Sequence, residues 1–241
     1  MTAPATSPTG YEVKFQRVGV GGGADLQIRS LLDKQQFYDP LGLALDAGIS
    51  SATWPLFGLL WPSGQRMAER MAQRPVTSER ILEIGCGLGL SSLVAHRRGA
   101  NVTASDCHPL THAFLDENTR LNGLPPMAYR HGLWGTAALR EDGLPVLTSA
   151  QDDGVSGLFD LIVGSDILYE RDDEGTLASF INAHAALVSE IWVVDPNRGN
   201  RAAFHKHMAR VGFAMHEQVL DQPAHQATLA YKGRMLTYKR G

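Results

Sequence analysis

The chain of 241 residues is 44% apolar and 20% charged, a composition typical of globular proteins with a sizeable core. Its 22 basic and 25 acidic side chains leave a net charge of −3, so no charge excess indicates a nucleic acid or an anionic membrane as partner. We expect a cytoplasmic protein, because the sequence has no basic-flanked apolar leader and no apolar run of about 18 residues, and because Cys86 and Cys107 form neither a CxxC pair nor a disulfide framework.

The first part of the chain is predicted to form a β-hairpin and a lid. Two strand-like stretches, 11–18 and 26–32, flank a glycine turn. Residues 39–63 are apolar and aromatic but are broken by prolines, so they can form only short helical turns. We therefore assign residues 1–63 to a hairpin and lid segment and expect a helix over 64–74.

From residue 80 the pattern changes to short apolar strands that alternate with helical stretches. The expected strands cover 80–85, 101–106, 128–133, 159–166 and 190–195, and the expected helices cover 90–98, 109–121, 173–188 and 200–211. Such alternation is typical of βαβ units and of a parallel sheet. Two further strand-like stretches, 212–220 and 234–240, have no helix between them and are expected to pair antiparallel. The sequence predicts an α/β fold with a seven-stranded, mostly parallel sheet and an antiparallel C-terminal strand pair.

The first of these strands runs into a glycine loop. Gly85, Gly87 and Gly89 allow the backbone to turn tightly and to bring its N–H groups against a ligand. Glu83 precedes them in the spacing E-x-G-x-G-x-G, which does not fit the GxGxxG pattern of dinucleotide-binding proteins. An acid at this position suits a cationic amino acid better than a pyrophosphate. The alternative is a tight strand-to-helix turn without a ligand.

Two further strands end in acidic residues. Asp106 lies about 20 residues beyond the glycine loop, where a carboxylate can accept hydrogen bonds from both hydroxyls of a ribose. Gly164 leaves room for a ligand near the end of a later strand, which then presents Asp166 and Tyr169 three residues apart. The alternative for both acids is a capping role at the start of the following helix or turn.

These motifs resemble those of a known enzyme class. The spacing at 83–89 together with Asp106 resembles the class I, seven-strand S-adenosylmethionine-dependent methyltransferases, and Asp166-x-x-Tyr169 resembles the D-x-x-Y motif of the family 16 type methyltransferases, which largely methylate protein lysines. The resemblance implies a Rossmann-like methyltransferase domain over residues 64–241. It also implies S-adenosyl-L-methionine as cofactor, S-adenosyl-L-homocysteine as product, and a catalytic role for the acid and the phenol in holding the acceptor amine.

Two tryptophans are further candidates for the cofactor site. The segment of Gly132, Leu133, Trp134 and Gly135 resembles the family's L-D-W-G segment at the adenine pocket, with leucine in place of the acid, and its tryptophan can pack on a purine ring. Trp61 precedes the helix that leads to the glycine loop and is expected over the methionine end of the cofactor. The alternatives are an ordinary core tryptophan and a hydrophobic staple before a helix.

Other candidate features carry less weight. Residues 195–199 (D-P-N-R-G) resemble the D-P-G-R segment of the branch that methylates the β subunit of electron transfer flavoprotein, although Asn197 departs from that pattern. His108, His112 and Asp116 are spaced four residues apart, and we interpret them as a solvated helix face rather than a metal site.

The preferred function is methyl transfer from S-adenosylmethionine to a lysine amine on a protein substrate. A second hypothesis is a methyltransferase of the same fold that acts on a small amine, and a third is an interaction module that binds the cofactor without turnover. A nicotinamide-dependent dehydrogenase is disfavoured by the glycine spacing and the antiparallel C-terminal pair. Neither a nucleic acid nor a membrane is expected as partner, and no metal is predicted.

Overall fold

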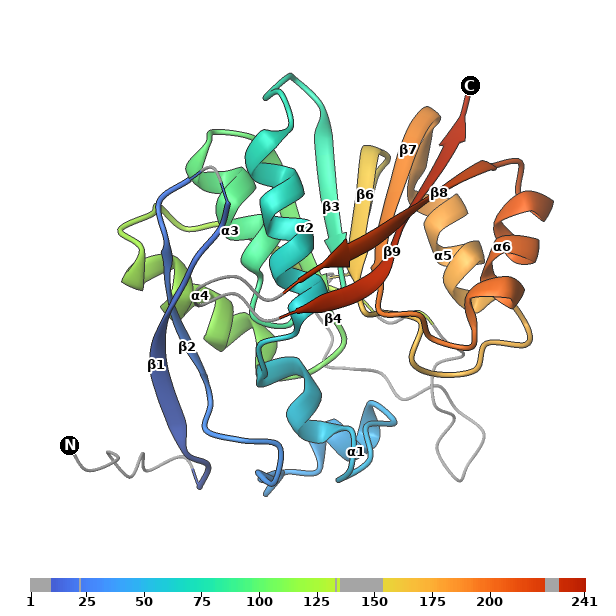
Figure 1. The fold of residues 1–241 in the computed structure, drawn as a ribbon. Helices are drawn as coiled ribbons and strands as arrows, with labels where there is room; N and C mark the ends of the chain where they lie inside the picture. Colours follow the sequence, from blue (N-terminus) through green and yellow to red (C-terminus); the bar gives the residue numbers. More distant parts are fainter. Residues whose placement is uncertain (1–9, 22, 133, 135–153, 224–229) are drawn as a thin grey trace.

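The structure, a computed structural model, describes residues 10–21, 23–132, 134, 154–223 and 230–241. A small two-stranded sheet lies beside a seven-stranded sheet, and helices cover both faces of the larger sheet (Figure 1). The described part of the chain contains no helix that is long and apolar enough to cross a membrane. The predicted α/β fold, with its seven-stranded and mostly parallel sheet, is confirmed.

The elements follow the expected order closely. The strands are β1 (Val13–Val18), β2 (Leu26–Leu31), β3 (Arg80–Ile84), β4 (Asn101–Asp106), β5 (Ala128–His131), β6 (Phe159–Ser165), β7 (Ala185–Asp195), β8 (Ala214–Gln222) and β9 (Tyr231–Arg240). The helices are α1 (Leu43–Asp46), the 3-10 helix η1 (Trp54–Gly58), α2 (Pro62–Gln73), α3 (Leu90–Arg97), α4 (Thr111–Leu121), α5 (Thr176–His184) and α6 (Arg201–Arg210). Helix α2 begins two residues earlier than predicted because Pro62 fits the first turn, where its missing N–H has no partner to lose.

The order of strands in the large sheet is β5-β4-β3-β6-β7-β9-β8. Strands β3 to β7 pair in parallel, whereas β9 is antiparallel to both of its neighbours. The chain order reverses between β3 and β6, so the connections leave these two strands in opposite directions. In parallel α/β sheets such a reversal opens a crevice at the carboxyl ends of the strands, and ligands bind there.

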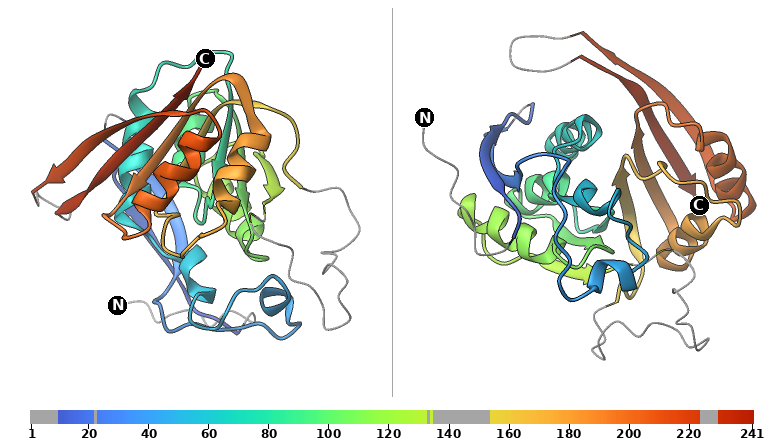
Figure 2. Two further views of the ribbon diagram at one scale, coloured as in Figure 1. Left: turned by 90° about the vertical axis from the view of Figure 1, so that its right-hand side faces the viewer. Right: turned by 90° about the horizontal axis from the view of Figure 1, so that it is seen from below.

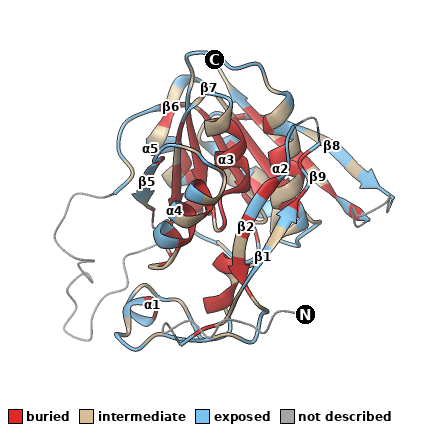
Figure 3. Cartoon of the chain, turned by 90° about the vertical axis from the view of Figure 1, so that its left-hand side faces the viewer, coloured by how far each residue is buried: buried red, intermediate tan, exposed pale blue. Residues whose placement is uncertain are grey.

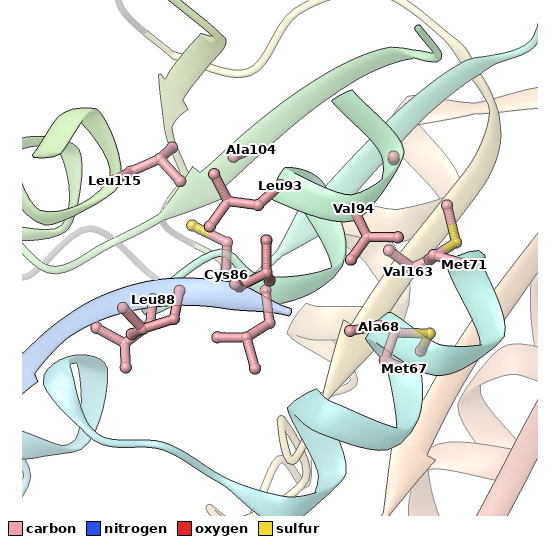
Figure 4. Packing of buried hydrophobic residues seen from close by; sticks show 14 of the residues in the cluster. Met67, Ala68, Met71, Cys86, Leu88, Leu93, Val94, Ala104, Leu115 and Val163 are labelled. Carbon is pink, nitrogen blue, oxygen red and sulfur yellow. The ribbon is translucent and has the colours of Figure 1, made fainter. Parts of the chain in front are cut away.

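The core has two parts, one on each face of the sheet. Helices α2, α3 and α4 pack on one face, and α5 and α6 pack on the other (Figure 2). Successive residues of a strand point to opposite faces, so Leu161 and Val163 of β6 join the first core while Ile162 joins the second. Figure 3 shows buried residues concentrated along the central strands, and Figure 4 shows α2 packed through Met67 and Met71 against the first core.

One predicted helix is too long. The expectation over residues 173–188 is wrong at its end, because α5 ends at His184 and Ala185 begins strand β7. The apolar run that follows His184 is compatible with a helix, but Ala185 pairs with Phe159 of β6. The guanidinium of Arg240 also donates to the carbonyls of Ala185 and Ala186, at 3.0 and 3.1 Å. These long-range partners occupy backbone groups that a longer helix would have needed.

The N-terminal hairpin binds to helix α4 through two asparagines. Asn118 accepts the N–H of Arg29 at 2.7 Å and donates to its carbonyl at 3.3 Å, and Asn122 makes the same pair of hydrogen bonds with Gln27 at 2.9 and 2.8 Å. The two asparagines lie four residues apart on one helix face, and their partners lie two apart on the free edge of β2. The side-chain amides therefore pair with the hairpin edge as a neighbouring strand would.

We expect Asn118→Ala to lower the free energy of unfolding by about 2–3 kcal/mol, because the buried amide leaves backbone groups of Arg29 and Leu88 without their partner. Asn122→Ala is the matched control, and since its hydrogen bonds to Gln27 are exposed its loss should stay near about 1 kcal/mol. Urea unfolding of both variants measures the difference. Equal losses would show that the hairpin does not depend on the buried amide.

Candidate functional site

A cavity of about 530 Å³ lies at the carboxyl ends of β3, β4 and β6, a size typical of small-molecule sites. Eight of the ten residues proposed from the sequence line it, namely Trp61, Glu83, Gly85, Gly87, Asp106, Trp134, Asp166 and Tyr169. The segment between β2 and α2, for which the sequence predicts a lid, contributes Ala47, Ile49 and Phe57 to the cavity wall. The topology thus brings together motifs that are up to about a hundred residues apart in the sequence.

The glycine loop has the backbone that its sequence predicts. Gly85, Gly87 and Gly89 have φ values of 59°, 49° and 71°, in the left-handed region that favours glycine. A Cβ added at Gly87 would lie 2.8 Å from the carbonyl oxygen of Phe57, and one at Gly89 would lie 2.4 Å from Leu115. The loop therefore needs glycine for its conformation and for the close packing of its neighbours.

Glu83 holds the glycine loop in place through hydrogen bonds to helix α3. Its carboxylate accepts hydrogen bonds from the hydroxyls of Ser91 and Ser92 and from the N–H of Ser92, the last at 2.8 Å. The side chain is almost fully buried, and burial raises its pKa against the opposing effect of these donors. Glu83 lines the cavity, but its principal contacts are with the first turn of α3, so it holds the loop in place.

Asp106 connects the loop to the next strand. Its two oxygens accept the N–H groups of Gly87 and His108, both at 2.9 Å. Burial raises the pKa of this carboxyl, and the two backbone donors oppose the rise. Helix α4 begins only at Thr111, so Asp106 does not cap it. Each oxygen retains a further lone pair, which a ribose hydroxyl can use.

His108 corrects one prediction. We expected it on a solvated helix face with His112 and Asp116, but it precedes α4 and is only 3% exposed. Its ring stacks on Phe57 of the lid, with 3.7 Å between ring centroids. His112 and Asp116 are exposed, with 3.5 Å between Nε2 and Oδ2, as expected of a solvated helix face. Among the described residues no cluster of side chains could hold a metal ion.

The His108 ring also carries a buried donor that has no partner among the described residues. Its Nδ1 accepts the N–H of Leu110 at 3.2 Å, so the proton of the neutral ring is on Nε2. Nε2 is buried and has no partner among the described residues. A buried donor without a partner costs free energy. His108 lines the cavity, but its Nε2 lies buried within the wall.

The other end of the cavity holds the D-x-x-Y pair. Asp166 adopts a φ of 56°, and its carboxylate pairs with the Nε of Arg198 at 2.8 Å. Tyr169 is 45% exposed, and partial burial, followed by the neighbouring Cys107 and Glu170, raises the pKa of its phenol above the ordinary value of about 10. The phenol is therefore neutral at physiological pH.

Two of the proposed residues do not line the cavity. Gly89 lies behind the loop against Leu115, and Gly164 lies inside the sheet, where an added Cβ would meet Ile167 at 2.6 Å. The small size of Gly164 thus serves packing of the cavity wall. Trp134 is described and lies in the wall, whereas Leu133 and Gly135 of the same predicted segment lie outside the described residues.

The sequence did not identify three parts of the wall. Arg198 was noted only for the match of its segment to a family pattern, and Phe57 and residues 47–49 were assigned no more than a lid. The segment 195–199 carried the only usable signal, since a loop after a central strand reaches the same sheet edge as the other motifs. Trp61, which the sequence placed here, is oriented by a hydrogen bond from its Nε1 to the Leu56 carbonyl at 2.8 Å.

The fold is the one that Rossmann-like methyltransferases of known structure have. A methyltransferase from Pyrococcus furiosus aligns with 90% of this chain and 89% of its own at a TM-score of 0.55 and 15% identity. Magnesium protoporphyrin IX methyltransferase from Synechocystis, solved with bound S-adenosylmethionine, aligns with 75% and 80% at a TM-score of 0.52 and 16% identity. These likenesses define the fold.

Residues 58–210 match the family model described as lysine methyltransferase, and the chain belongs to this family. It is 28% identical over 148 residues to the electron transfer flavoprotein β subunit lysine methyltransferase of Rattus norvegicus, which covers 60% of this chain and 51% of that protein. It is 30% identical over 126 residues to the histone-arginine methyltransferase METTL23 of the same species, over half of each chain. The chain spans about half the length of these curated relatives.

We expect Asp106→Ala to weaken S-adenosylmethionine binding at least tenfold, because the predicted hydrogen bonds from the ribose to this carboxylate would be lost, and a charge-assisted hydrogen bond contributes about 1.5–3 kcal/mol. Asp116→Ala, which removes an exposed acid from helix α4, is the matched control and should bind as the wild type does. Isothermal titration calorimetry measures both. Unchanged affinity of Asp106→Ala would rule out the ribose assignment.

We also expect His108 to make folding sensitive to acid. Burial lowers its pKa to about 3, against a weaker opposing effect of Asp39, so between about pH 6.5 and 3 the unfolded chain binds a proton that the folded ring does not. Stability therefore falls as the pH falls below about 6.5, by about 1.4 kcal/mol per pH unit from this ring. His108→Gln lacks this contribution. The free energy of unfolding of the wild type relative to that of His108→Gln should therefore fall by about 2 kcal/mol from about pH 7.5 to about pH 5. Urea unfolding at both pH values tests this, and a constant difference would contradict it.

Proposed function

We propose that the protein is an S-adenosylmethionine-dependent protein-lysine N-methyltransferase. The observation that carries the proposal is a single cavity in which a glycine loop with a left-handed backbone, Asp106 and the pair Asp166 and Tyr169 meet at one edge of the sheet. Family membership supports the reaction class. Because the curated relatives extend well beyond the matched region, the activity and the acceptor of this chain remain our proposal.

The residues of the cavity fit this cofactor. Gly85 and Gly87 line the cavity with their backbone, and Asp106 beside them keeps lone pairs that a ribose hydroxyl can use. The described part of the wall contains the acids Glu83, Asp106, Asp166 and Glu170 and one guanidinium, that of Arg198. A wall with this excess of carboxylates favours a positively charged ligand.

When bound, S-adenosylmethionine supplies a methyl group on a positively charged sulfur. The acceptor nitrogen would form a bond to the methyl carbon, and the electron pair of the broken carbon–sulfur bond would stay on sulfur. The protein's task is alignment and exclusion of water. Asp166 accepts a hydrogen bond from the incoming amine, and the neutral phenol of Tyr169 lines its path. Phe57, Leu59 and Trp61 of the lid region cover the cavity with apolar surface.

The other candidate functions lack such support. A small amine would also fit beside Asp166, so a small-molecule methyltransferase of the same fold stays the second hypothesis. A binding module without turnover would not need the ion-paired Asp166 together with Tyr169 at the mouth of the cavity. The free thiols of Cys86 and Cys107 support the proposal of a reducing, cytoplasmic compartment.

The test is incubation with tritiated S-adenosylmethionine and desalted lysate protein, with purified electron transfer flavoprotein β subunit in a parallel reaction. We expect label in protein that is released on hydrolysis as methylated lysine. Asp166→Ala and Tyr169→Ala should lower the rate at least about tenfold and leave cofactor affinity within a few fold, because both act on the acceptor. Asp116→Ala is again the control. Label on arginine, or only on small molecules, would overturn the proposal.

A further inference from the structure

The carboxylate of Asp166 is held in one position. Its backbone N–H donates to the carbonyl of Val194 at 2.8 Å, although its φ of 56° lies in the left-handed region that few residues other than glycine adopt. The side chain is 9% exposed, and its Oδ1 accepts the Nε of Arg198 at 2.8 Å. Among the described residues, Arg198 is the partner of Asp166 in an ion pair.

Arg198 is itself fixed by the loop that follows β7. Its backbone N–H donates to the Oδ2 of the buried Asp195 at 2.9 Å. The preceding Asn197 has a φ of 65°, and its Oδ1 accepts hydrogen bonds from Arg201 at 3.3 Å and from Arg234 at 3.2 Å. A loop held at this many points presents the guanidinium to Asp166 with little freedom to move.

Other charged and titratable groups lie near Asp166. One of them is Glu170, an exposed acid that lines the same cavity and is unchanged in every variant compared below. Asp195 lies at the end of β7, where it is balanced by Arg201 at 3.8 Å and by the loop N–H groups. Tyr169 follows β6, and Tyr231 begins β9 with its hydroxyl 2.9 Å from that of Ser63. Burial raises the pKa of Tyr231 to about 12 and raises that of Tyr169 as well, so both phenols are neutral over the pH range of the reaction.

We propose, on the basis of the proposed function, that Arg198 is a positioning residue that aims the Asp166 carboxylate at the acceptor and cancels its charge, so that the lysine amine reacts in its neutral form. A carboxylate without this partner would attract the ammonium form and hold the proton on the amine. An ammonium group has no lone pair and cannot attack the methyl carbon. The ion pair therefore offers a hydrogen-bond acceptor without the net charge that would block the nucleophile.

The test is the dependence of the labelling rate on pH, with desalted lysate protein as acceptor and saturating tritiated S-adenosylmethionine. In Arg198→Gln the pH of half-maximal rate should rise by about one unit, because the unpaired carboxylate stabilises the ammonium form. In Asp166→Asn the pH of half-maximal rate should fall, because the positive charge of the guanidinium is then uncompensated. The maximal rate should also drop, because the carboxylate that accepts the hydrogen bond of the amine is lost. Arg198→Lys should restore the wild-type midpoint. A purely structural role would not move the midpoint in opposite directions.

Arg120→Gln is the matched control, because it removes an exposed, ion-paired guanidinium on α4 whose partner is Glu117 and not Asp166 or the loop 195–199. Its pH midpoint should equal that of the wild type. A wild-type midpoint in Arg198→Gln, or the same shift in Arg120→Gln, would overturn the proposal.

A crystal structure of Arg198→Gln without acceptor gives a readout that does not depend on activity. We expect the Asp166 carboxylate to leave its wild-type position, and an unmoved carboxylate would overturn the positioning role. If the wild type labels no lysine, the proposed function fails, whereas lysine labelling with unchanged pH midpoints refutes only the role of Arg198.

Discussion

The rest of the site depends on the hydrogen bonds that the buried carboxylate of Glu83 accepts. It joins the end of β3 to the first turn of α3 through Ser91 and Ser92, where a negative charge is favoured by the helix dipole. The glycine loop spans these two fixed ends, and on its other side Cys86 donates to the Ser105 carbonyl at 3.0 Å. Contacts to α3 and β4 thus fix the conformation of the glycine loop. Because the loop lines the cavity, these contacts also determine the shape of the cavity.

The fold and half of the site could be predicted because their signals are local. The glycine spacing, Asp106 and the pair Asp166 and Tyr169 each follow a recognisable strand, and a parallel sheet brings strand ends to one edge. The sheet with its antiparallel pair followed from the alternation of strands and helices. What these signals share is that a short window of sequence contains both the residue and the element that positions it.

The remainder depends on contacts between distant residues. His108 is buried because Phe57, about fifty residues earlier, covers its ring. The sequence around His108 does not predict this contact. Arg198 follows β7 and acquires its partner Asp166 at the end of the neighbouring strand β6, a pairing of strands that the local sequence pattern does not specify. The end of α5 is set by Phe159 and Arg240, which lie on strands far from it in sequence. In each case tertiary contact overrides what a local pattern favours.

The insertion of β9 between β7 and β8 has a consequence for the order in which the molecule can assemble. Strand β8 is synthesised before β9 but has no described strand to pair with until β9 is in place, since β7 bonds β9 directly. Tyr231, the first residue of β9, also forms the hydrogen bond with Ser63 at the start of α2. Strands β3 and β4 can therefore pair before the C-terminal edge of the sheet is complete. The pairing of β9 with β7 joins residues that are far apart in the sequence, and such non-local pairing slows folding.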